Sequence, residues 1–143
     1  MKNEGFIIEL DFDFDLFAII SSAKEYKLAW WFNKVLCIDL QKDEDISIDF
    51  LKGKSLSVSN YSFKTTHSSI HLIRNKCSEY ANFAKPFLLP ELQQYDYLLM
   101  VKDPAELYEL KEWTQKVSAV PIVQLIQQID INSLQSKENL IFE

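Results

Sequence analysis

The first residues of the chain alternate between apolar and acidic side chains. In "IIELDFDFDLF", residues 7–17, the carboxylates are Glu9, Asp11, Asp13 and Asp15, and apolar residues stand between them. A period of two predicts a β-strand with one buried and one solvated face. Same-face neighbours on a strand lie ~6.6 Å apart, whereas Ca²⁺ needs six to eight oxygens at ~2.4 Å. We therefore expect a solvated face here rather than a cation site.

Two helices are predicted from their start signals. Ser22 and Glu25 spell an S-x-x-E capping box, which predicts a helix from Ala23 to about Leu36. Further on, the stretch 103–106 offers an N-cap Asp, an N1 Pro and an N3 Glu, which predicts a helix ending near Ser118. One face of this second helix is predicted to contain Leu107, Leu110, Thr114 and Val117. On another face, Glu112 and Lys116 have the i,i+4 spacing of an ion pair.

Each predicted helix lies between two strand-like segments. The first helix follows the opening strand and precedes 37–40, and the second helix follows 97–101 and precedes a strand within 120–131. Between these two β-α-β units, further segments read as three strands (46–51, 56–66 and 69–75), a turn (52–54) and a loop (77–89). The pattern predicts an α+β fold, a ferredoxin-like two-layer sandwich with both helices on one face of a mixed sheet. The length fits a single domain spanning residues 1–143.

The first helix carries more apolar surface than one sheet can cover. At 100° per residue, its core arc contains Leu28, Ala29, Trp31, Phe32, Val35 and Leu36. Tyr26, Trp30 and Cys37 form a second arc, which Asn33 on one side and Lys27 and Lys34 on the other separate from the first. One interpretation is that the loop at 77–89 or the C-terminal tail covers Tyr26 and Trp30. The other is a contact with a second subunit or a partner protein, because such aromatic residues are enriched at interface centres.

The composition narrows the function further. The chain has 143 residues, 48% of them hydrophobic, with only two Gly and a net charge of −6. Two glycines cannot form a glycine-rich phosphate loop, and an acidic chain repels nucleic acid. An apolar run of membrane-spanning length and a signal peptide are both absent from the pattern, so we expect a cytoplasmic protein without a membrane partner. Cys37 and Cys77 are expected to be buried thiols, and the pattern predicts no cofactor.

Candidate catalytic groups are sparse. His67 and His71 would stand roughly 13 Å apart on a strand, too far for one metal ion, so they read as surface or half-buried polar residues. Neither cysteine nor any serine lies in a nucleophile signature. Glu91 and Asp96 could form an acid–base pair, or each could cap and pair locally, and a separation of five residues fixes no geometry. The sequence therefore gives no support to a catalytic role.

The stretch "LPELQQYDY", residues 89–97, resembles a family signature. It is similar to the string that gives its name to the IPExxxVDY family, small bacterial proteins of unknown function. The residues that match this string are Pro90, Glu91, Asp96 and Tyr97. Leu89 replaces its Ile and Tyr95 replaces its Val. The resemblance extends to "ISSAKEYKLAWWFN" and to "SKENLIFE", so it covers nearly the whole chain. It implies family membership without implying an activity.

Three functions remain to be compared. The first is a non-catalytic protein that forms a homodimer or binds another protein through Tyr26, Trp30 and Cys37 or through a sheet edge. The alternative is a regulatory domain of ACT-like type that binds a small ligand, although the chain has no Gly-rich β-to-α turn to admit one. The third is an enzyme that uses Glu91 and Asp96.

Overall fold

A computed structural model describes residues 13–49, 55–77 and 87–142. The predicted opening strand is partly among them: strand β2 spans Asp15–Ile20. Phe14 and Leu16 are buried and Asp13 is exposed, as the alternation predicts. Glu9 and Asp11, like the predicted turn at 52–54, lie outside the described residues.

Six strands form the main sheet, in the order β3-β6-β7-β8-β2-β9. Besides β2 they are β3 (Gln41–Lys42), β6 (Asn60–Lys64), β7 (Ser69–Arg74), β8 (Tyr97–Lys102) and β9 (Leu125–Ile129). Every neighbouring pair is antiparallel. The prediction of a mixed sheet is therefore wrong, although the strands on either side of each helix do run in the same direction. β2 separates β8 from β9, and β6, β7 and β8 separate β2 from β3.

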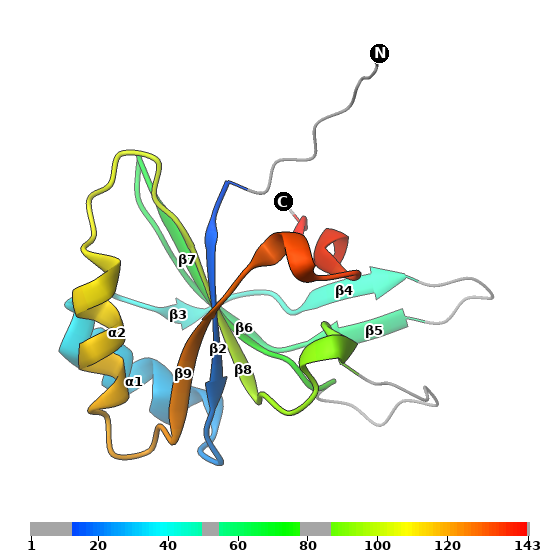
Figure 1. Cartoon of the computed structure of the whole chain (residues 1–143), viewed down its shortest axis with the longest axis horizontal. Helices are drawn as coiled ribbons and strands as arrows, with labels where there is room; N and C mark the ends of the chain where they lie inside the picture. The colour runs from blue at the N-terminus through cyan, green and yellow to red at the C-terminus, as the bar shows by residue number, and fades with distance from the viewer. Residues whose placement is uncertain (1–12, 50–54, 78–86, 143) are drawn as a thin grey trace.

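Both helices pack on one face of this sheet (Figure 1). Helix α1 spans Glu25–Leu36 and helix α2 spans Leu110–Ser118. The predicted core arc of α1 is confirmed. Four of its residues are buried, namely Leu28, Ala29, Phe32 and Leu36, and the partly buried Trp31 and Val35 pack beside them. Neither helix in the described part of the chain is long and apolar enough to cross a membrane.

The other face of the sheet is also covered, and this gives a third layer that a two-layer sandwich does not have. Its cover consists of the β4–β5 hairpin (Ile46–Asp49 and Ser55–Val58), the turn η2 (Pro90–Leu92) and the C-terminal turns η3 (Ile131–Ser133) and η4 (Lys137–Leu140). In Figure 1 these segments lie across the sheet from α1 and α2. The central strands need both covers because their consecutive residues are apolar: in β2, Leu16 and Ala18 face one core, and Phe17 and Ile19 face the other.

The predicted start of the first helix is wrong. α1 begins at Glu25, and its N-cap Lys24 makes no side-chain cap bond, so the Ser22–Glu25 capping box does not form. The residues before the helix are held by tertiary contacts instead. The Ser21 amide donates to Asp96 Oδ2 at 2.9 Å, and the Ser21 hydroxyl donates to the Ile122 carbonyl at 2.5 Å. These tertiary contacts, rather than a side-chain cap, hold the residues that precede α1 in place.

The second helix also starts later than predicted, at Leu110 rather than near Pro104. Asp103 does cap backbone amides, but they belong to a turn: its carboxylate accepts from Leu107 N at 2.9 Å and Tyr108 N at 2.8 Å. Glu106 has φ 55°, which a right-handed helix cannot contain. Leu107 is consequently exposed instead of facing the core. The end at Ser118 and the Glu112–Lys116 ion pair at 3.0 Å are confirmed.

The strand boundaries agree in part with the prediction. The segments 69–75 and 97–101 correspond to β7 and β8, whereas 56–66 is divided between β5 and β6. The predicted strand at 37–40 is wrong, because pairing begins only at Gln41. Ile38 and Leu40 are nevertheless buried under the helices, which accounts for their apolar pattern.

Candidate functional site

The family-like motif at residues 89–97 holds other segments in place. Glu91, at the start of η2, accepts hydrogen bonds from Gln135 N at 2.6 Å, from Ser136 N at 2.8 Å and from the Ser136 hydroxyl. Partial burial raises the pKa of Glu91, but the hydrogen bonds from Ser136 and from the backbone outweigh it, and the net pKa is lowered. Glu91 therefore acts as an ionised anchor for the C-terminal segment.

The rest of the motif contacts strand β9 and the residues that precede α1. Asp96 accepts from the Ser21 amide at 2.9 Å, and the Tyr97 hydroxyl donates to the Ala23 carbonyl at 2.6 Å. Burial, followed by the nearby Glu25 carboxylate, raises the pKa of Tyr97 to about 12. Tyr95 donates to Gln127 Oε1 in β9 at 2.9 Å. Leu89 and Tyr97 are buried, so the motif combines core packing with these contacts.

The buried side chain of Asn75, which the sequence analysis did not single out, forms hydrogen bonds with the backbone of this motif. Asn75 follows β7 and is fully buried. Its amide group lies 3.3, 3.0 and 3.3 Å from the carbonyls of Leu89, Leu92 and Tyr95, and its Oδ1 accepts from Leu89 N at 2.8 Å. The only sequence signal was a polar residue at the end of an apolar strand. This side chain closes the irregular segment that precedes β8.

These contacts bear directly on the proposed acid–base pair. Glu91 is engaged with the C-terminal segment, whereas Asp96 is engaged with the chain before α1. Each carboxylate already accepts hydrogen bonds from its own chain, and no contact between the two carboxylates or with a shared residue supports a joint acid–base role in the described part of the chain. The geometry therefore favours a structural role for the motif.

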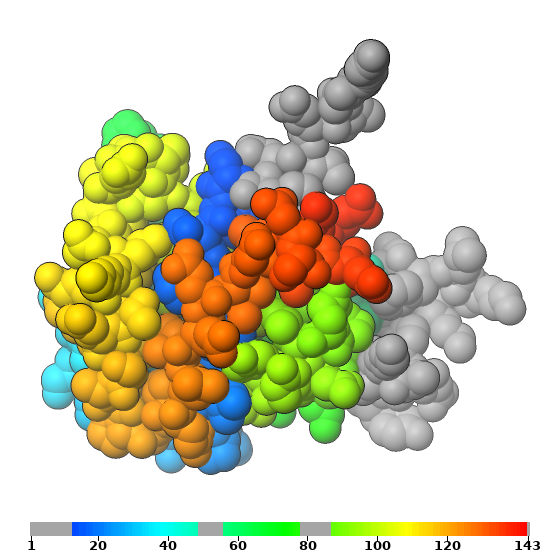
Figure 2. Space-filling model, in the orientation of Figure 1, coloured from blue at the N-terminus to red at the C-terminus, as the bar shows by residue number. Residues whose placement is uncertain are grey.

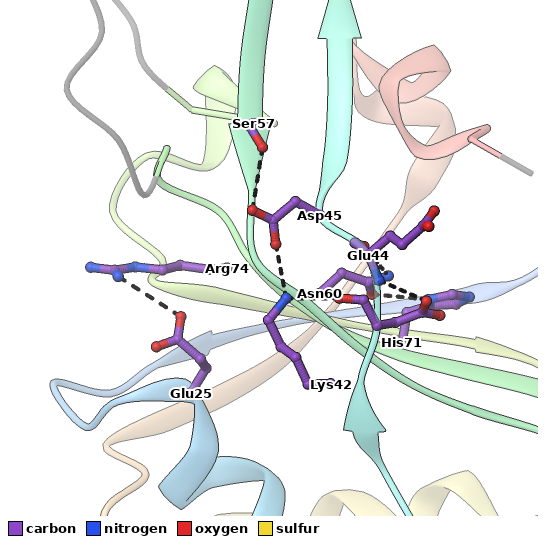
Figure 3. A network of polar contacts seen from close by, with 9 residues as sticks. Glu25, Lys42, Glu44, Asp45, Ser57, Asn60, His71 and Arg74 are labelled. Carbon is purple, nitrogen blue, oxygen red and sulfur yellow. Dashed lines mark hydrogen bonds and ion pairs between the residues drawn. The ribbon is translucent and has the colours of Figure 1, made fainter.

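The two histidines separate in the structure. His67 is exposed in the turn before β7, whereas His71 is 1% exposed, so the prediction of a surface or half-buried residue is wrong for His71. His71 Nδ1 lies 3.0 Å from Asn60 Oδ1, and Asn60 Nδ2 donates to the Glu44 carbonyl (Figure 3). Since the Asn60 amide is oriented by Glu44, its Oδ1 must accept, and His71 Nδ1 carries the proton.

A small cavity lies beside His71. The ring of Phe142 meets the His71 ring edge to face, with centroids 5.1 Å apart. The adjoining cavity of about 140 Å³ is also lined by Ser69 and Lys102 and by the apolar residues Phe14, Met100, Leu140 and Ile141. Its walls come from the sheet and from the C-terminal segment of the same chain. Among the described residues, no three His, Cys, Asp or Glu side chains are placed to hold a metal ion.

The outer face of α1 presents two aromatic side chains to solvent. Tyr26 is 55% exposed and Trp30 is 56% exposed. The C-terminal tail does not cover them, because it packs on the opposite face of the sheet. Residues 78–86 of the predicted covering loop lie outside the described residues. Cys37 is exposed at the end of the helix and Cys77 is buried, and neither forms a disulfide. The exposure of Cys37 corrects the prediction that it is buried.

Trp30 is held in position by its neighbours. Its ring packs edge to face on Trp31 with centroids 5.2 Å apart, and Lys34 Nζ lies 5.0 Å from the Trp30 centroid. Lys27 and Lys34 are exposed on the same side of the helix. We call Tyr26, Lys27, Trp30 and Lys34 the α1 surface. It is an aromatic surface with local positive charge on an acidic protein.

Comparison with known proteins found no matching family model, no matching curated protein and no matching solved structure. The resemblance to the IPExxxVDY family therefore stays a prediction.

Proposed function

We propose that this protein is a non-catalytic interaction module that binds another protein through the α1 surface. The observation that carries the proposal is the pair of aromatic side chains at positions 26 and 30, each more than half exposed on a helix whose other face fills the core. Large aromatic residues with a polar group are enriched at interface centres and depleted elsewhere on protein surfaces.

The α1 surface can provide binding energy at low entropic cost. The Trp30 ring already packs against Trp31 and under the Lys34 ammonium, so little rotamer freedom is left to lose on binding. A desolvated Trp at the centre of an interface contributes about 2 kcal/mol or more, which corresponds to roughly a thirtyfold change in affinity. Tyr26 stands one helical turn away and extends the same contact.

The charges on the α1 surface favour a different protein over a second copy of this one. Two α1 surfaces facing each other would bring Lys27 and Lys34 of both copies together, and like charges opposed across an interface cost several kcal/mol. Glu25 offers little compensation because it lies 3.9 Å from Arg74. The partner surface is therefore one with apolar side chains ringed by carboxylates.

The topology supports the ferredoxin-like interpretation as part of this proposal. The strands in the order β7-β8-β2-β9, with α1 and α2 on one face, correspond to the four-stranded split β-α-β arrangement of that fold. In this interpretation β3, β6 and the β4–β5 hairpin are additions to it. The resemblance of residues 89–97 to the IPExxxVDY signature is compatible with such a scaffold.

The other two functions receive less support. The enzyme hypothesis needs Glu91 and Asp96 in one cleft, and they contact different segments. The ACT-like hypothesis needs a polar pocket between subunits, whereas the cavity beside His71 is built by one chain and lined largely by apolar side chains.

A site-specific photocrosslinker tests the α1 surface directly. The photoreactive amino acid is placed at Tyr26 or, as a matched control, at Lys111, an exposed position on α2, and the protein is expressed in the cells that encode it. We expect crosslinks to one or a few proteins from position 26 only, and their loss when Trp30→Glu is added. In binding measurements with the purified partner, Trp30→Ala is expected to weaken affinity roughly thirtyfold.

Two outcomes would contradict the proposal. Equal crosslinking from positions 26 and 111 would show that α1 is not a preferred contact. Crosslinks from position 26 that survive Trp30→Glu would show that the aromatic pair contributes nothing to recognition. Affinity should also fall with added salt, because carboxylates of the partner face Lys27 and Lys34.

A further inference from the structure

The two edges of the main sheet are built differently. One edge is β3, which has only two residues and carries Lys42 in an ion pair with Asp45 at 2.8 Å. Short length and charge are the usual means by which a sheet edge avoids pairing with another chain. The other edge is β9, which has neither of these protections.

β9 is a complete and uncharged edge strand. All five of its residues pair with β2, from Leu125 opposite Ile20 to Ile129 opposite Leu16. Its sequence, "LIQQI", contains no charged residue and no proline, and none of its side chains is fully buried. Figure 2 shows this segment, in orange, on the face turned to the viewer with no other segment in front of it. Its outward backbone groups are therefore available for another strand.

We propose that a second copy of this chain pairs with β9, antiparallel and edge to edge, about a two-fold axis through Gln127. This pairing would join two six-stranded sheets into one continuous sheet. It sets Leu125 opposite Ile129 of the second copy, Ile126 opposite Gln128, and Gln127 opposite itself. The inference goes beyond the proposed function, because it uses neither α1 nor the α1 surface.

The register shows why the occupant is a second copy. Directly opposed residues of an antiparallel pair lie on the same face of the sheet. On one face Leu125 would then meet Ile129, and the two Gln127 side chains would lie opposite each other. Because each Gln127 Oε1 already accepts from Tyr95, the Nε2 group is the one that would donate across the pair. The nearest charged residue, Asp130, falls opposite the neutral Gln124. A self-complementary, uncharged edge satisfies the requirement of an isologous interface.

The expected affinity is modest because the edge is short. Five residues extend only about 17 Å along the strand, and the main apolar addition is Leu125, which is 43% exposed. Interfaces at the small end of the size range are typically weak and transient. We therefore expect dimerisation in the micromolar range.

A charge-pair experiment tests the predicted register. Sedimentation velocity is measured from about 5 to about 500 µM protein, a range that brackets micromolar affinity, on the wild type, on Gln127→Lys, on Gln127→Glu and on an equal mixture of the two variants. Each single variant places like charges opposite each other and should dimerise at least about tenfold more weakly. The mixture places Lys opposite Glu and should restore the dimer. Gln41→Lys, on the β3 edge, is the matched control and should dimerise like the wild type.

The outcomes separate cleanly. Recovery in the mixture supports the register, and it cannot arise from misfolding of either variant. A wild type that stays monomeric over the whole range, single variants that dimerise normally, or a mixture that stays monomeric would each overturn the inference. Trp30→Glu is expected to leave this dimer unchanged, so a failure here is distinct from a failure of the α1 proposal.

Discussion

Asn75→Ala is the most informative single change to the fold, because one buried side chain serves four backbone groups. The substitution removes the acceptor of Leu89 N and the donor that faces the carbonyls of Leu89, Leu92 and Tyr95. Two of these carbonyls keep another partner, since Leu89 O accepts from Leu92 N at 3.0 Å and Leu92 O accepts from Tyr95 N at 2.9 Å. The Leu89 amide and the Tyr95 carbonyl are therefore the two groups that lose their hydrogen bond without a second partner among the described residues to replace it.

The magnitude follows from these two groups. A buried group without its hydrogen bond costs about 1–3 kcal/mol, so the two groups together with the small void give a loss of about 3–4 kcal/mol. With an m-value near 2 kcal/mol/M, the urea midpoint should fall by roughly 1.5–2 M with an unchanged slope. Urea unfolding followed by tryptophan fluorescence measures both quantities. Asn132→Ala, at an exposed position, is the control and should change stability by less than about 0.5 kcal/mol.

Asn75→Asp adds a test of the same contacts by pH. The new carboxylate keeps the size of the amide but would direct negative charge at the three carbonyls, so burial should raise its folded-state pKa above the unfolded value. A group with a raised folded pKa loses stability as pH rises, so this variant should be less stable at about pH 7 than at about pH 5 relative to wild type. A loss below about 1 kcal/mol for Asn75→Ala, or no dependence on pH for Asn75→Asp, would refute the assigned hydrogen bonding.

Three further changes test the contacts around the motif and the first helix. Because the folded-state pKa of Glu91 is lowered, its contribution is present at neutral pH and is lost as pH falls below the ordinary value of 4.5; Glu91→Gln should flatten that acid dependence in urea unfolding. Tyr97→Phe removes the bond to the Ala23 carbonyl and should cost about 1 kcal/mol. Because the Tyr97 pKa is raised from 10.0 to about 12, the wild type should lose stability between those pH values, and an absorbance titration of the variant should lack this late tyrosine. Cys37 ends α1 with φ 57°, so Cys37→Gly should raise the free energy of unfolding by about 1 kcal/mol in thermal melts under reducing conditions, whereas Cys37→Ala should not.

Local pattern was a good guide wherever neighbouring residues decide the outcome. The core face of α1, the position of Tyr26 and Trp30 away from that face, and the strands β7 and β8 follow from the periodicity of apolar residues, because burial of one face is what selects a period. Whether another segment covers Tyr26 and Trp30 was left open by the sequence. The solvated position of Asp13 follows from the same rule.

Start signals were a poor guide because distant contacts compete with them. Ser22 and Glu25 have the spacing of a capping box, yet Ser21 bonds to Asp96 and Ile122, and these bonds fix the chain at that point. Asp103 caps a turn, as its residue type predicts, but the left-handed Glu106 ends that turn before a helix can begin. A cap is a local preference of about 1 kcal/mol, which a few tertiary bonds exceed.

The sequence by itself determined the class of this protein: one α+β chain with enough apolar residues for a core and with a second apolar arc on its first helix. Only the tertiary structure decided that the sheet is antiparallel, that a third layer covers its second face, and that Asn75 holds the segment containing Glu91 and Asp96. The physical reason is the range of the interactions involved. Periodicity records which side of an element is buried, whereas strand order, buried hydrogen bonds and open edges depend on residues far apart along the chain.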